Sequence, residues 1–363
     1  MGIRCGIVGL PNVGKSTLFN ALTGAGIPAE NYPFTTIEPN LGVAQVPDLR
    51  LKAIAAIVQP GEIVPTAIEF VDIAGLVEGA SRGEGLGNKF LSHIRETNAI
   101  VHVVRCFEDD DVVHVEGTID PIRDIETINL ELIYADAGSV ERSLERNGRK
   151  AKSGDKEAQS AVAVLERLAA HLDEGKPART LRLTADDLLV VRDLFLLTMK
   201  PVEYIANVDE AGALGNKYVD LVGDYAAAQH STVVVICAAV EGEIAALDPH
   251  DRDEFLADLG QTEPGLNRVI RAAYELLGLN TFFTSGEKQV RAWPFRHGAT
   301  ASQVAGSIHT DFEKGFIRAE VIAYDDFIEL GGEQAAKEAG RWRLEGKDYP
   351  VQEADIILFR FNV

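Results

Sequence analysis

Short apolar runs rich in β-branched residues recur along the chain, and stretches with helical spacing separate them. Three runs come early and two come late, at residues 5–10, 67–73, 99–107, 201–208 and 232–239. Because the runs lack strict alternation of apolar and polar residues, they are typical of strands buried on both faces of a parallel sheet. Five such strands separated by helices predict a doubly wound, mostly parallel α/β domain formed by residues 1–123 and 200–278.

Between the third and fourth runs the pattern becomes helical. Apolar residues at spacings of three and four make two stripes, one from Ile125 to Leu144 and one from Val162 to Leu172. A polar, glycine-bearing stretch, NGRKAKSGDK, lies between the stripes and is a natural turn. This arrangement predicts an antiparallel α-helical hairpin inserted over residues 124–199. A further helix is expected from Thr184, where the Thr-x-x-Asp spacing indicates a capping box.

Near the C-terminus the chain changes to short strand-like pieces around one helical stretch at 302–315. The pieces lie at residues 281–286, 290–295, 316–324 and 354–363. The pattern predicts a small α+β module over residues 279–363.

Acidic residues dominate the composition. Asp and Glu outnumber Lys and Arg by 56 to 35, which gives a formal net charge of −21 at pH 7. Any nucleic-acid binding must therefore use a local basic patch. No segment reaches the roughly 20 apolar residues of a membrane span, and no basic leader precedes the first strand, so we expect a soluble, cytoplasmic protein. Cys5, Cys106 and Cys237 each lie in an apolar run and are expected to be buried thiols.

Residues 9–16, GLPNVGKS, match the phosphate-binding pattern G-x-x-x-x-G-K-[ST]. The pattern follows a predicted strand and opens a predicted helix at 17–22, which is the context that the motif requires. In such a loop the backbone N–H groups bind phosphate oxygens, Lys15 reaches the β- and γ-phosphates, and Ser16 can ligate Mg²⁺. We therefore predict a P-loop nucleotide site whose nucleotide-binding residues include Asn12, Val13, Gly14, Lys15, Ser16 and Thr17.

Two further elements complete the pattern of a nucleotide switch. Asp72 begins the sequence Asp-Ile-Ala-Gly at the end of a strand, so its carboxylate can hold a Mg²⁺-bound water while the amide of Gly75 senses the γ-phosphate. Thr35 and Thr36 lie between the P-loop helix and the next strand, where a threonine can complete the magnesium shell only while the γ-phosphate is present. The predicted magnesium ligands are Ser16, Thr36 and Asp72.

Four segments, GLPNVGKST, NYPFTTIEPN, DIAGLVEGAS and HTDFEKGFIRAEVI, together resemble the Obg-like ATPase (YchF) family of P-loop switch proteins. The resemblance covers essentially the whole chain. It implies a P-loop NTPase G domain of the Obg type with an inserted coiled-coil hairpin and a C-terminal TGS domain, a small β-grasp-like module. It also implies ATP hydrolysis and association with the ribosome.

The base-reading motif departs from that of most relatives of this fold, which read guanine through Asn-Lys-x-Asp. The corresponding strand end here is Asn207-Val208-Asp209-Glu210, so the lysine is missing and the last carboxylate is one methylene longer. Adenine presents an amine at N6 and acceptors at N1 and N7, which an asparagine can serve. The residues therefore favour ATP over GTP, although guanine reading by Glu210 stays open. The resemblance implies the same ATP preference and a main-chain contact from Val208 to the base.

Hydrolysis needs a group that orients water. Ras-like switches use a glutamine directly after the Asp-x-x-Gly glycine, but Leu76 occupies that position here. Either turnover is very slow or another residue acts. His114 lies in the loop EDDDVVHVEG after the strand at 99–107, on the nucleotide side of a parallel sheet, where a neutral imidazole could position water. The alternative is a solvated or loop-packed histidine. The resemblance implies that His114 is catalytic.

The tip of the hairpin, residues 139–156, carries six basic residues against three acidic ones. Such a patch could meet a phosphate backbone, although a charge run is usually a solvated face. The resemblance adds Lys314 and Arg318 as contacts of the TGS-like module and implies a ribosome partner, the large subunit and its rRNA. We expect a monomer that binds and slowly hydrolyses ATP as a switch. The alternatives are a GTP-specific switch of the same fold and a non-catalytic nucleotide sensor that serves as an interaction scaffold.

Overall fold

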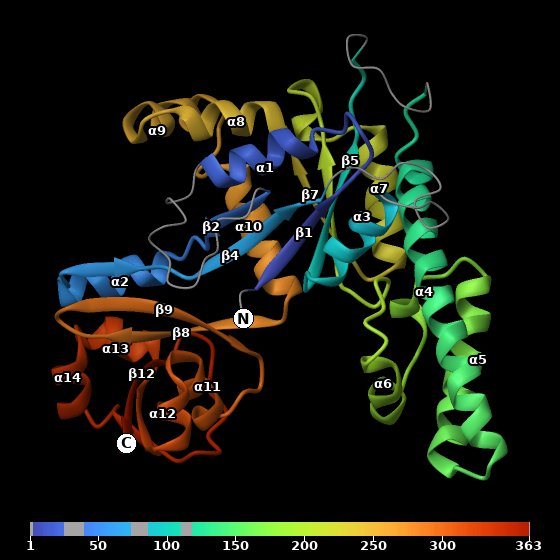
Figure 1. Cartoon of the computed structure of the whole chain (residues 1–363). Helices are drawn as coiled ribbons and strands as arrows, with labels where there is room; N and C mark the ends of the chain where they lie inside the picture. Colours follow the sequence, from blue (N-terminus) through green and yellow to red (C-terminus); the bar gives the residue numbers. More distant parts are fainter. Residues whose placement is uncertain (1–2, 25–39, 74–85, 110–117, 363) are drawn as a thin grey trace. The chain divides into compact units, whose positions relative to one another are not determined.

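The structure is a computed structural model that describes residues 3–24, 40–73, 86–109 and 118–362 (Figure 1). The chain forms two compact units. The first comprises Met1–Ala44 and Glu69–Ala273, and the second, called the C-terminal unit, comprises Gln45–Ile68 and Tyr274–Val363.

The first unit contains a six-stranded sheet in the order β2-β4-β1-β5-β6-β7. The pairs β1–β4, β1–β5, β5–β6 and β6–β7 are all parallel. The five predicted strands are confirmed, and β2 is an additional edge strand that the apolar pattern does not reveal. The strands are β1 (Arg4–Val8), β2 (Leu41–Gln45), β4 (Ala67–Asp72), β5 (Ala99–Arg105), β6 (Val202–Asn207) and β7 (Thr232–Ile236).

Burial explains why these strands form where they do. Every residue of β5 and β6 is buried, which is the environment that continuous apolar runs predict. Helices follow the strands in the alternation of a doubly wound fold. They are α1 (Lys15–Gly24), α3 (Leu86–Arg95), α7 (Lys217–Ala228), α8 (Ala238–Ala246), α9 (Pro249–Asp258) and α10 (Gly265–Leu276), with the short 3₁₀ turn η3 (Ala211–Leu214).

A helical hairpin is inserted between β5 and β6. It consists of α4 (Pro121–Lys152) and α5 (Lys156–Asp173), joined by a tight turn in which Gly154 has a φ of 92°. The predicted stripes face each other, and Val140, Leu165 and Leu168 are buried between the helices. The short elements η2 (Ala178–Thr180) and α6 (Ala185–Arg192) follow, and both halves of the predicted capping box of α6 are present.

A buried carboxylate fastens the hairpin to the chain that returns toward β6. Asp136 of α4 is 1 % exposed, and its oxygens accept hydrogen bonds from the amides of Leu197 and Thr198, each 2.8 Å, and from the Thr198 hydroxyl at 2.7 Å. Burial raises the pKa of Asp136, and the hydrogen bonds from Thr198 and Leu197 oppose that rise. Three hydrogen-bond donors compensate the carboxylate of Asp136 for its loss of water. Because these donors belong to Leu197 and Thr198, they also fix the base of the hairpin to the chain that leads into β6.

The C-terminal unit contains a second six-stranded sheet in the order β11-β10-β12-β8-β9-β3. Apolar clusters lie against it, one of which contains Phe283 and Ile356 and the other Phe282 and Phe359. Its strands are β3 (Glu62–Val64), β8 (Leu279–Ser285), β9 (Gln289–Arg296), β10 (Phe316–Ile322), β11 (Arg343–Glu345) and β12 (Ile356–Phe361). Its helices are α2 (Leu49–Val58), α11 (Ala301–Ile308), α12 (Thr310–Lys314), α13 (Tyr324–Leu330) and α14 (Glu333–Glu338).

One helix in this unit differs from its prediction. The helical stretch expected at 302–315 is two helices, α11 and α12, because His309 between them is extended, with φ −160° and ψ 144°. His309 then caps α12, and its ring nitrogen accepts from the amide of Asp311 at 3.2 Å.

The C-terminal unit also takes in a segment from near the start of the chain. Residues 45–68 contribute α2 and β3, although the sequence pattern assigns all of residues 1–123 to the nucleotide domain. Leu51 and Ile54 of α2 are buried in the same core cluster as Phe283 and Ile356. The Thr66 hydroxyl donates to the carbonyl of Ala292 at 3.0 Å, which fixes the segment to β9.

None of the helices within the described ranges is long and apolar enough to span a bilayer.

A buried histidine in the first unit makes stability depend on pH. His102 of β5 is 2 % exposed and packs against the ring of Tyr204 on β6, with 5.5 Å between ring centroids. Burial, aided by the nearby positive charge of Arg179, lowers the pKa of His102 to about 3. An unfolded histidine titrates near 6.5. As the pH falls below about 6.5, the unfolded chain therefore takes up a proton that the folded chain does not, and stability is lost progressively toward pH 3.

We predict that His102→Gln reduces the loss of stability between pH 7 and pH 5 by about 2 kcal/mol relative to the unsubstituted protein. Urea unfolding at the two pH values measures this difference. The control is His297→Gln, which makes the same substitution at an exposed histidine. An equal pH dependence in the His102 variant and the unsubstituted protein would show that another group carries the effect.

Candidate functional site

The predicted phosphate loop connects β1 to α1, and its backbone has the conformation that its glycines and asparagine permit. Asn12 and Gly14 both have positive φ, at 63° and 89°. A Cβ at Gly9 would lie 2.7 Å from the carbonyl oxygen of Val103, so this glycine lets the loop pass close to β5. A Cβ at Gly14 would lie 2.2 Å from Nδ2 of Asn207. The two glycines are therefore needed for close packing as well as for the turn.

Helix α1 presents its N-terminus to this loop. Leu18 and Leu22 are buried and fix the helix, while Ser16 and Thr17 are exposed in its first turn. The first turn carries no acidic residue, so the partial positive charge of the helix N-terminus is not neutralised from within. Unpaired N–H groups at such a terminus form a ready site for phosphate.

The lysine of the loop is paired with the carboxylate predicted to serve the metal. Nζ of Lys15 contacts Oδ1 of Asp72, and the Lys15 residue is only 9 % exposed. Asp72 is placed by the sheet, because it ends β4 beside Ile7 of β1 and its amide donates to the carbonyl of Asn40 at 2.8 Å. The structure therefore brings Lys15 and Asp72 into contact, and Ser16 follows Lys15 in the first turn of α1. The Ser16 hydroxyl and the Asp72 carboxylate are the hard oxygen ligands that Mg²⁺ prefers.

Several predicted functional residues lie outside the described residues. They are Thr35, Thr36, Gly75, Leu76 and His114. Their roles remain predictions from the sequence.

The asparagine of the base-reading motif has an additional role that the sequence does not reveal. Asn207 ends β6 and is 4 % exposed. Its Nδ2 donates to the carbonyl of Val13 in the phosphate loop at 2.9 Å, and its Oδ1 accepts from the amide of Ala238 at 2.9 Å. The side chain thus joins the phosphate loop to the start of α8. These two bonds use one of the two N–H groups and one of the two carbonyl lone pairs of the amide.

The residues after Asn207 differ in what they can offer a base. Val208 is 2 % exposed, and its amide extends the sheet by donating to Ile236 at 2.9 Å. The carboxylate of Asp209 accepts from the amide of Gly212 at 2.8 Å, so it caps the local turn η3. Glu210 is exposed at the start of η3. Of the two acids, Glu210 is the one whose carboxylate is not used as a local cap.

Two residues of this site are not revealed by the sequence motifs. Ala238 contributes only its amide, which no side-chain motif can reveal. Asn216 bonds the carbonyl of Cys106 at 2.7 Å and caps α7, with its Oδ1 accepting from the amides of Tyr218 and Val219. An asparagine just before a helical pattern is a recognisable cap signal, but its second partner lies more than a hundred residues away.

Two of the three cysteines are buried thiols, as predicted. Cys5 and Cys106 are buried, but Cys237, which precedes α8, is partly exposed. Burial raises the pKa of the Cys106 thiol to about 12, so it stays protonated at neutral pH.

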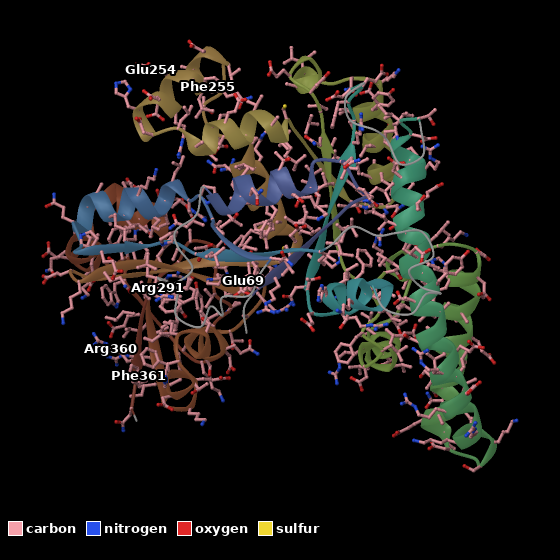
Figure 2. The ribbon with its side chains drawn as sticks, turned by 45° about the horizontal axis from the view of Figure 1, so that its top comes forward. Glu69, Glu254, Phe255, Arg291, Arg360 and Phe361 are labelled. Carbon is pink, nitrogen blue, oxygen red and sulfur yellow. The ribbon has the colours of Figure 1, made fainter. Side chains whose placement is uncertain are left out.

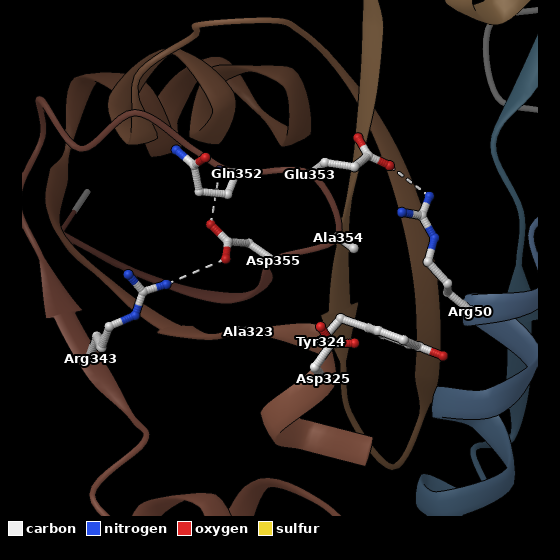
Figure 3. Close-up of a pocket in the computed structure, with 9 residues that line it drawn as sticks. All are labelled: Arg50, Ala323, Tyr324, Asp325, Arg343, Gln352, Glu353, Ala354 and Asp355. Atoms are coloured by element: carbon white, nitrogen blue, oxygen red, sulfur yellow. Dashed lines mark hydrogen bonds and ion pairs between the residues drawn. The ribbon is translucent and has the colours of Figure 1, made fainter. Parts of the chain in front are cut away.

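The C-terminal unit has a pocket of about 390 Å³ with a different chemistry (Figure 3). Arg50 pairs there with Glu353 at 2.6 Å, and Arg343 approaches Asp355 at 3.5 Å. Its two lining arginines face three lining carboxylates, those of Asp325, Glu353 and Asp355, and the lining contains no glycine. The candidate nucleotide site is therefore the one at the ends of β1, β4 and β6.

Comparison with known proteins places this site in a family. A family profile described as 50S ribosome-binding GTPase matches residues 4–171, and the YchF GTPase C-terminal profile, described as a protein of unknown function, matches residues 279–362. The ribosome-binding ATPase YchF of Haemophilus influenzae is 61 % identical, and that of Bacillus subtilis is 54 % identical. In both cases the match covers 100 % of this chain and 100 % of the relative. The chain belongs to the YchF family.

A solved YchF structure agrees with this placement. The YchF GTPase of Schizosaccharomyces pombe is 37 % identical and matches with a TM-score of 0.89, covering 99 % of this chain and 98 % of the other. The resemblance to the YchF family inferred from the four sequence segments is therefore confirmed, and with it the P-loop α/β fold.

We predict that Gly14→Ala lowers the affinity for ATP at least tenfold, about 1.4 kcal/mol. The new Cβ would require strained backbone at φ 89° and would meet Asn207. Equilibrium titration with ATP and Mg²⁺ measures the loss. The matched control is Gly24→Ala, because a Cβ there meets nothing within 4 Å. Unchanged affinity in the Gly14 variant would contradict the assignment of the phosphate loop.

Proposed function

We propose that this protein is an ATP-hydrolysing switch that binds the ribosome. One observation carries the proposal. The phosphate loop, whose Lys15 contacts Asp72, is hydrogen-bonded to Asn207, and the residue after Asn207 is not the lysine that reads guanine. The YchF relatives at 54–61 % identity are named ribosome-binding ATPases, which supports both halves of the proposal.

The choice of base is the point on which the names of relatives divide. The bacterial relatives are named ATPases, whereas the fission yeast structure and the profile at 4–171 are described as GTPases. We propose ATP, with GTP binding more weakly. Val208 is buried and apolar where a lysine would pack along guanine, and we assign its main chain, with Asn207 and Glu210, to the base site.

The phosphates would be held by residues 12–17, with Ser16, Asp72 and Thr36 as the ligands of Mg²⁺. The ion would neutralise charge on the β- and γ-phosphates. The contact between Lys15 and Asp72 neutralises both side chains. Nucleotide binding would therefore break this contact, so that Lys15 binds phosphate and Asp72 binds the metal. Gly75 and Thr36 would then sense the γ-phosphate. We assign the orientation of water to His114, since Leu76 cannot provide it.

We predict a preference for ATP over GTP of tenfold or more, measured by equilibrium binding of the two nucleotides side by side with Mg²⁺. The paired substitutions Val208→Lys and Glu210→Asp restore the guanine-reading pattern and should shift the preference toward GTP. The control is the single Glu210→Asp variant, which lacks the lysine. Tighter binding of GTP by the unsubstituted protein would favour the GTP-specific alternative.

The hairpin tip is the surface that we assign to the ribosome. Its basic side chains are exposed, and none of them makes an ion pair with a carboxylate in the described parts of the chain; they are Arg142, Arg146, Arg149, Lys150, Lys152 and Lys156. Arg149, Lys150 and Lys152 lie in the last turn of α4, where positive charge also stabilises the helix end. Arg142 and Arg146 lie further from that end, so the charge at the helix terminus does not account for them. A partner with a phosphate backbone, the rRNA of the large subunit, fits the charge.

The C-terminal unit supplies a second candidate contact. Arg318 of β10 and Arg360 of β12 are paired across the sheet, and both approach Glu320, at 3.5 Å and 2.9 Å. Each arginine keeps about half of its side chain exposed, and Figure 2 marks the position of Arg360. We propose that residues 279–363 of this unit form a TGS domain, that Arg318 and Lys314 contact the ribosome, and that the protein acts as a monomer.

We predict that replacing Arg146, Arg149 and Lys150 by Gln weakens cosedimentation with ribosomes and flattens its salt dependence, with the log–log slope falling by up to about 3. The matched control removes the same charge from three exposed lysines elsewhere, Lys52, Lys89 and Lys288. If both triple variants lose the same amount of ribosome binding, the loss is due to the change in net charge. The hairpin tip would then not be the ribosome-binding surface.

A further inference from the structure

The pocket of the C-terminal unit gathers charges of both signs around a space that the nucleotide site does not use (Figure 3). Four segments of the unit form its walls: the start of α2, the start of α13, β11 and the turn that leads into β12. Its volume of about 390 Å³ lies within the range of small-molecule sites, about 300–1,000 Å³. The space therefore suits a small organic molecule.

A residue with unusual backbone separates the two acids of the turn. Ala354 has a φ of 65°, in the left-handed region that residues other than glycine rarely adopt, and it is 6 % exposed. Its amide donates to the carbonyl of Thr281 at 2.7 Å, and the carbonyl of Asp355 accepts from the amide of Phe283 at 2.9 Å. These bonds fix the turn to β8. Figure 3 shows the side chains of Glu353 and Asp355 pointing away from each other on either side of Ala354.

Asp355 presents a carboxylate oxygen that the protein solvates poorly. The residue is 2 % exposed, and its Oδ2 accepts from the Tyr349 hydroxyl at 2.8 Å and from the amide of Gln352 at 3.0 Å. Among the described residues Oδ1 meets only Arg343, at 3.5 Å, which is beyond the usual hydrogen-bond range of about 2.7–3.2 Å. Burial raises the pKa of Asp355. A further donor at Oδ1 would therefore stabilise the charged carboxylate.

Arg50 supplies unused donors to the same pocket. Its Nε and Nη2 bond Asp48 at 2.9 Å and 2.8 Å, and Nη2 also pairs with Glu353 at 2.6 Å. Nη1 has no hydrogen-bond partner within the described ranges, so both of its N–H groups are unused. Glu353 is fixed in turn, because its Oε2 accepts from the amide of Thr281 at 2.8 Å. The guanidinium is therefore held in place with two donors for a ligand.

The wall at the start of α13 adds a negative charge and an aromatic ring. Asp325 is exposed in the first turn of α13 and makes no hydrogen bond or ion pair with any residue that the structure describes. Tyr324 is partly buried against the core cluster of the unit, and its ring extends along the pocket in Figure 3. With Asp325 included, three carboxylates face two guanidinium groups, which leaves the lining with an excess of one negative charge.

We propose that this pocket binds a small zwitterion of the α-amino acid class. The ammonium group of the ligand bonds Oδ1 of Asp355 and the carboxylate of Asp325, and its carboxylate accepts from Nη1 of Arg50. The side chain of the ligand lies along Tyr324. A lone cation leaves Nη1 without an acceptor, and a lone anion meets the excess of carboxylates, so a molecule with both charges fits better than either.

This site contains none of the residues assigned to the nucleotide, so the test is independent of the proposed function. Equilibrium dialysis of the full chain against each standard L-amino acid, in labelled form, measures binding. We expect at least one of them to bind with one molecule per chain and a Kd of about 1 mM or lower. Its decarboxylated amine and its deaminated acid should each bind at least tenfold more weakly, about 1.4 kcal/mol.

Two results of this experiment would overturn the proposal. If the amine binds as tightly as the amino acid, the pocket is a cation site and the donors of Arg50 play no part. If no amino acid binds at about 10 mM, tenfold above the expected Kd, the pocket is an ordinary surface hollow.

Two variants locate the binding. Asp355→Asn keeps the shape of the side chain and removes its charge, so it should raise the Kd at least tenfold. Because Asp355 also bonds Tyr349 and Gln352, a second variant leaves these bonds intact. Asp325→Asn changes an exposed side chain and should raise the Kd by about three- to fivefold, the effect of an exposed ion pair.

The matched control is Asp348→Asn, which makes the same change at an exposed aspartate outside the pocket lining and should leave the Kd unchanged. If Asp325→Asn and Asp348→Asn have the same Kd, the ligand does not meet Asp325 and the proposal fails. Full affinity in a folded Asp355→Asn variant would likewise place the amino acid elsewhere on the protein.

Discussion

The nucleotide site depends on one buried side-chain amide. Asn207 bonds Val13 in the phosphate loop and Ala238 at the start of α8, and its backbone carbonyl accepts the amide of Cys106. These bonds join the segments that follow β1, β5, β6 and β7. Leaving a buried amide without a hydrogen-bond partner costs about 1–3 kcal/mol, so separation of these loops is unfavourable by that amount. The site is therefore a single scaffold and not a set of independent loops, and the close approach of Gly14 to this amide is part of it.

This constraint bears on the proposed base-reading segment, in which Asn207 is present and the guanine-specific lysine is absent. The asparagine is needed whichever purine is bound, because it connects the loops before any base arrives. A lysine at position 208 would serve only guanine, and here a buried valine occupies the position while its amide continues the sheet. Asp209 is likewise committed to the turn. Under the proposed assignment, base choice would rest on Val208 and Glu210, whose side chains take no part in the bonds that Asn207 makes.

The sequence predicts those parts of the structure whose signal is local. The strands at 99–107 and 201–208 are recognisable because every residue of β5 and β6 is buried, and the hairpin because its stripes repeat over several turns. The phosphate loop is recognisable because its chemistry requires fixed spacing. The contacts of Asn207 and Asn216 could not be predicted, since their partners lie 194 and 110 residues away. Edge strand β3, of three residues, is too short for a periodic signal, and no apolar run marks edge strand β2.

The segment at 45–68 shows most clearly how tertiary context overrides position in the sequence. It lies between Thr36 and Asp72, the two elements expected to sense nucleotide, yet Leu51 and Ile54 belong to the core of the C-terminal unit. That unit therefore cannot bury its own core from residues 274–363 alone. Removing two large apolar side chains from a packed core costs several kcal/mol, comparable with the net stability of a small domain. The C-terminal unit is thus not an appendage of the chain, because its folding requires the segment that joins β2 to β4.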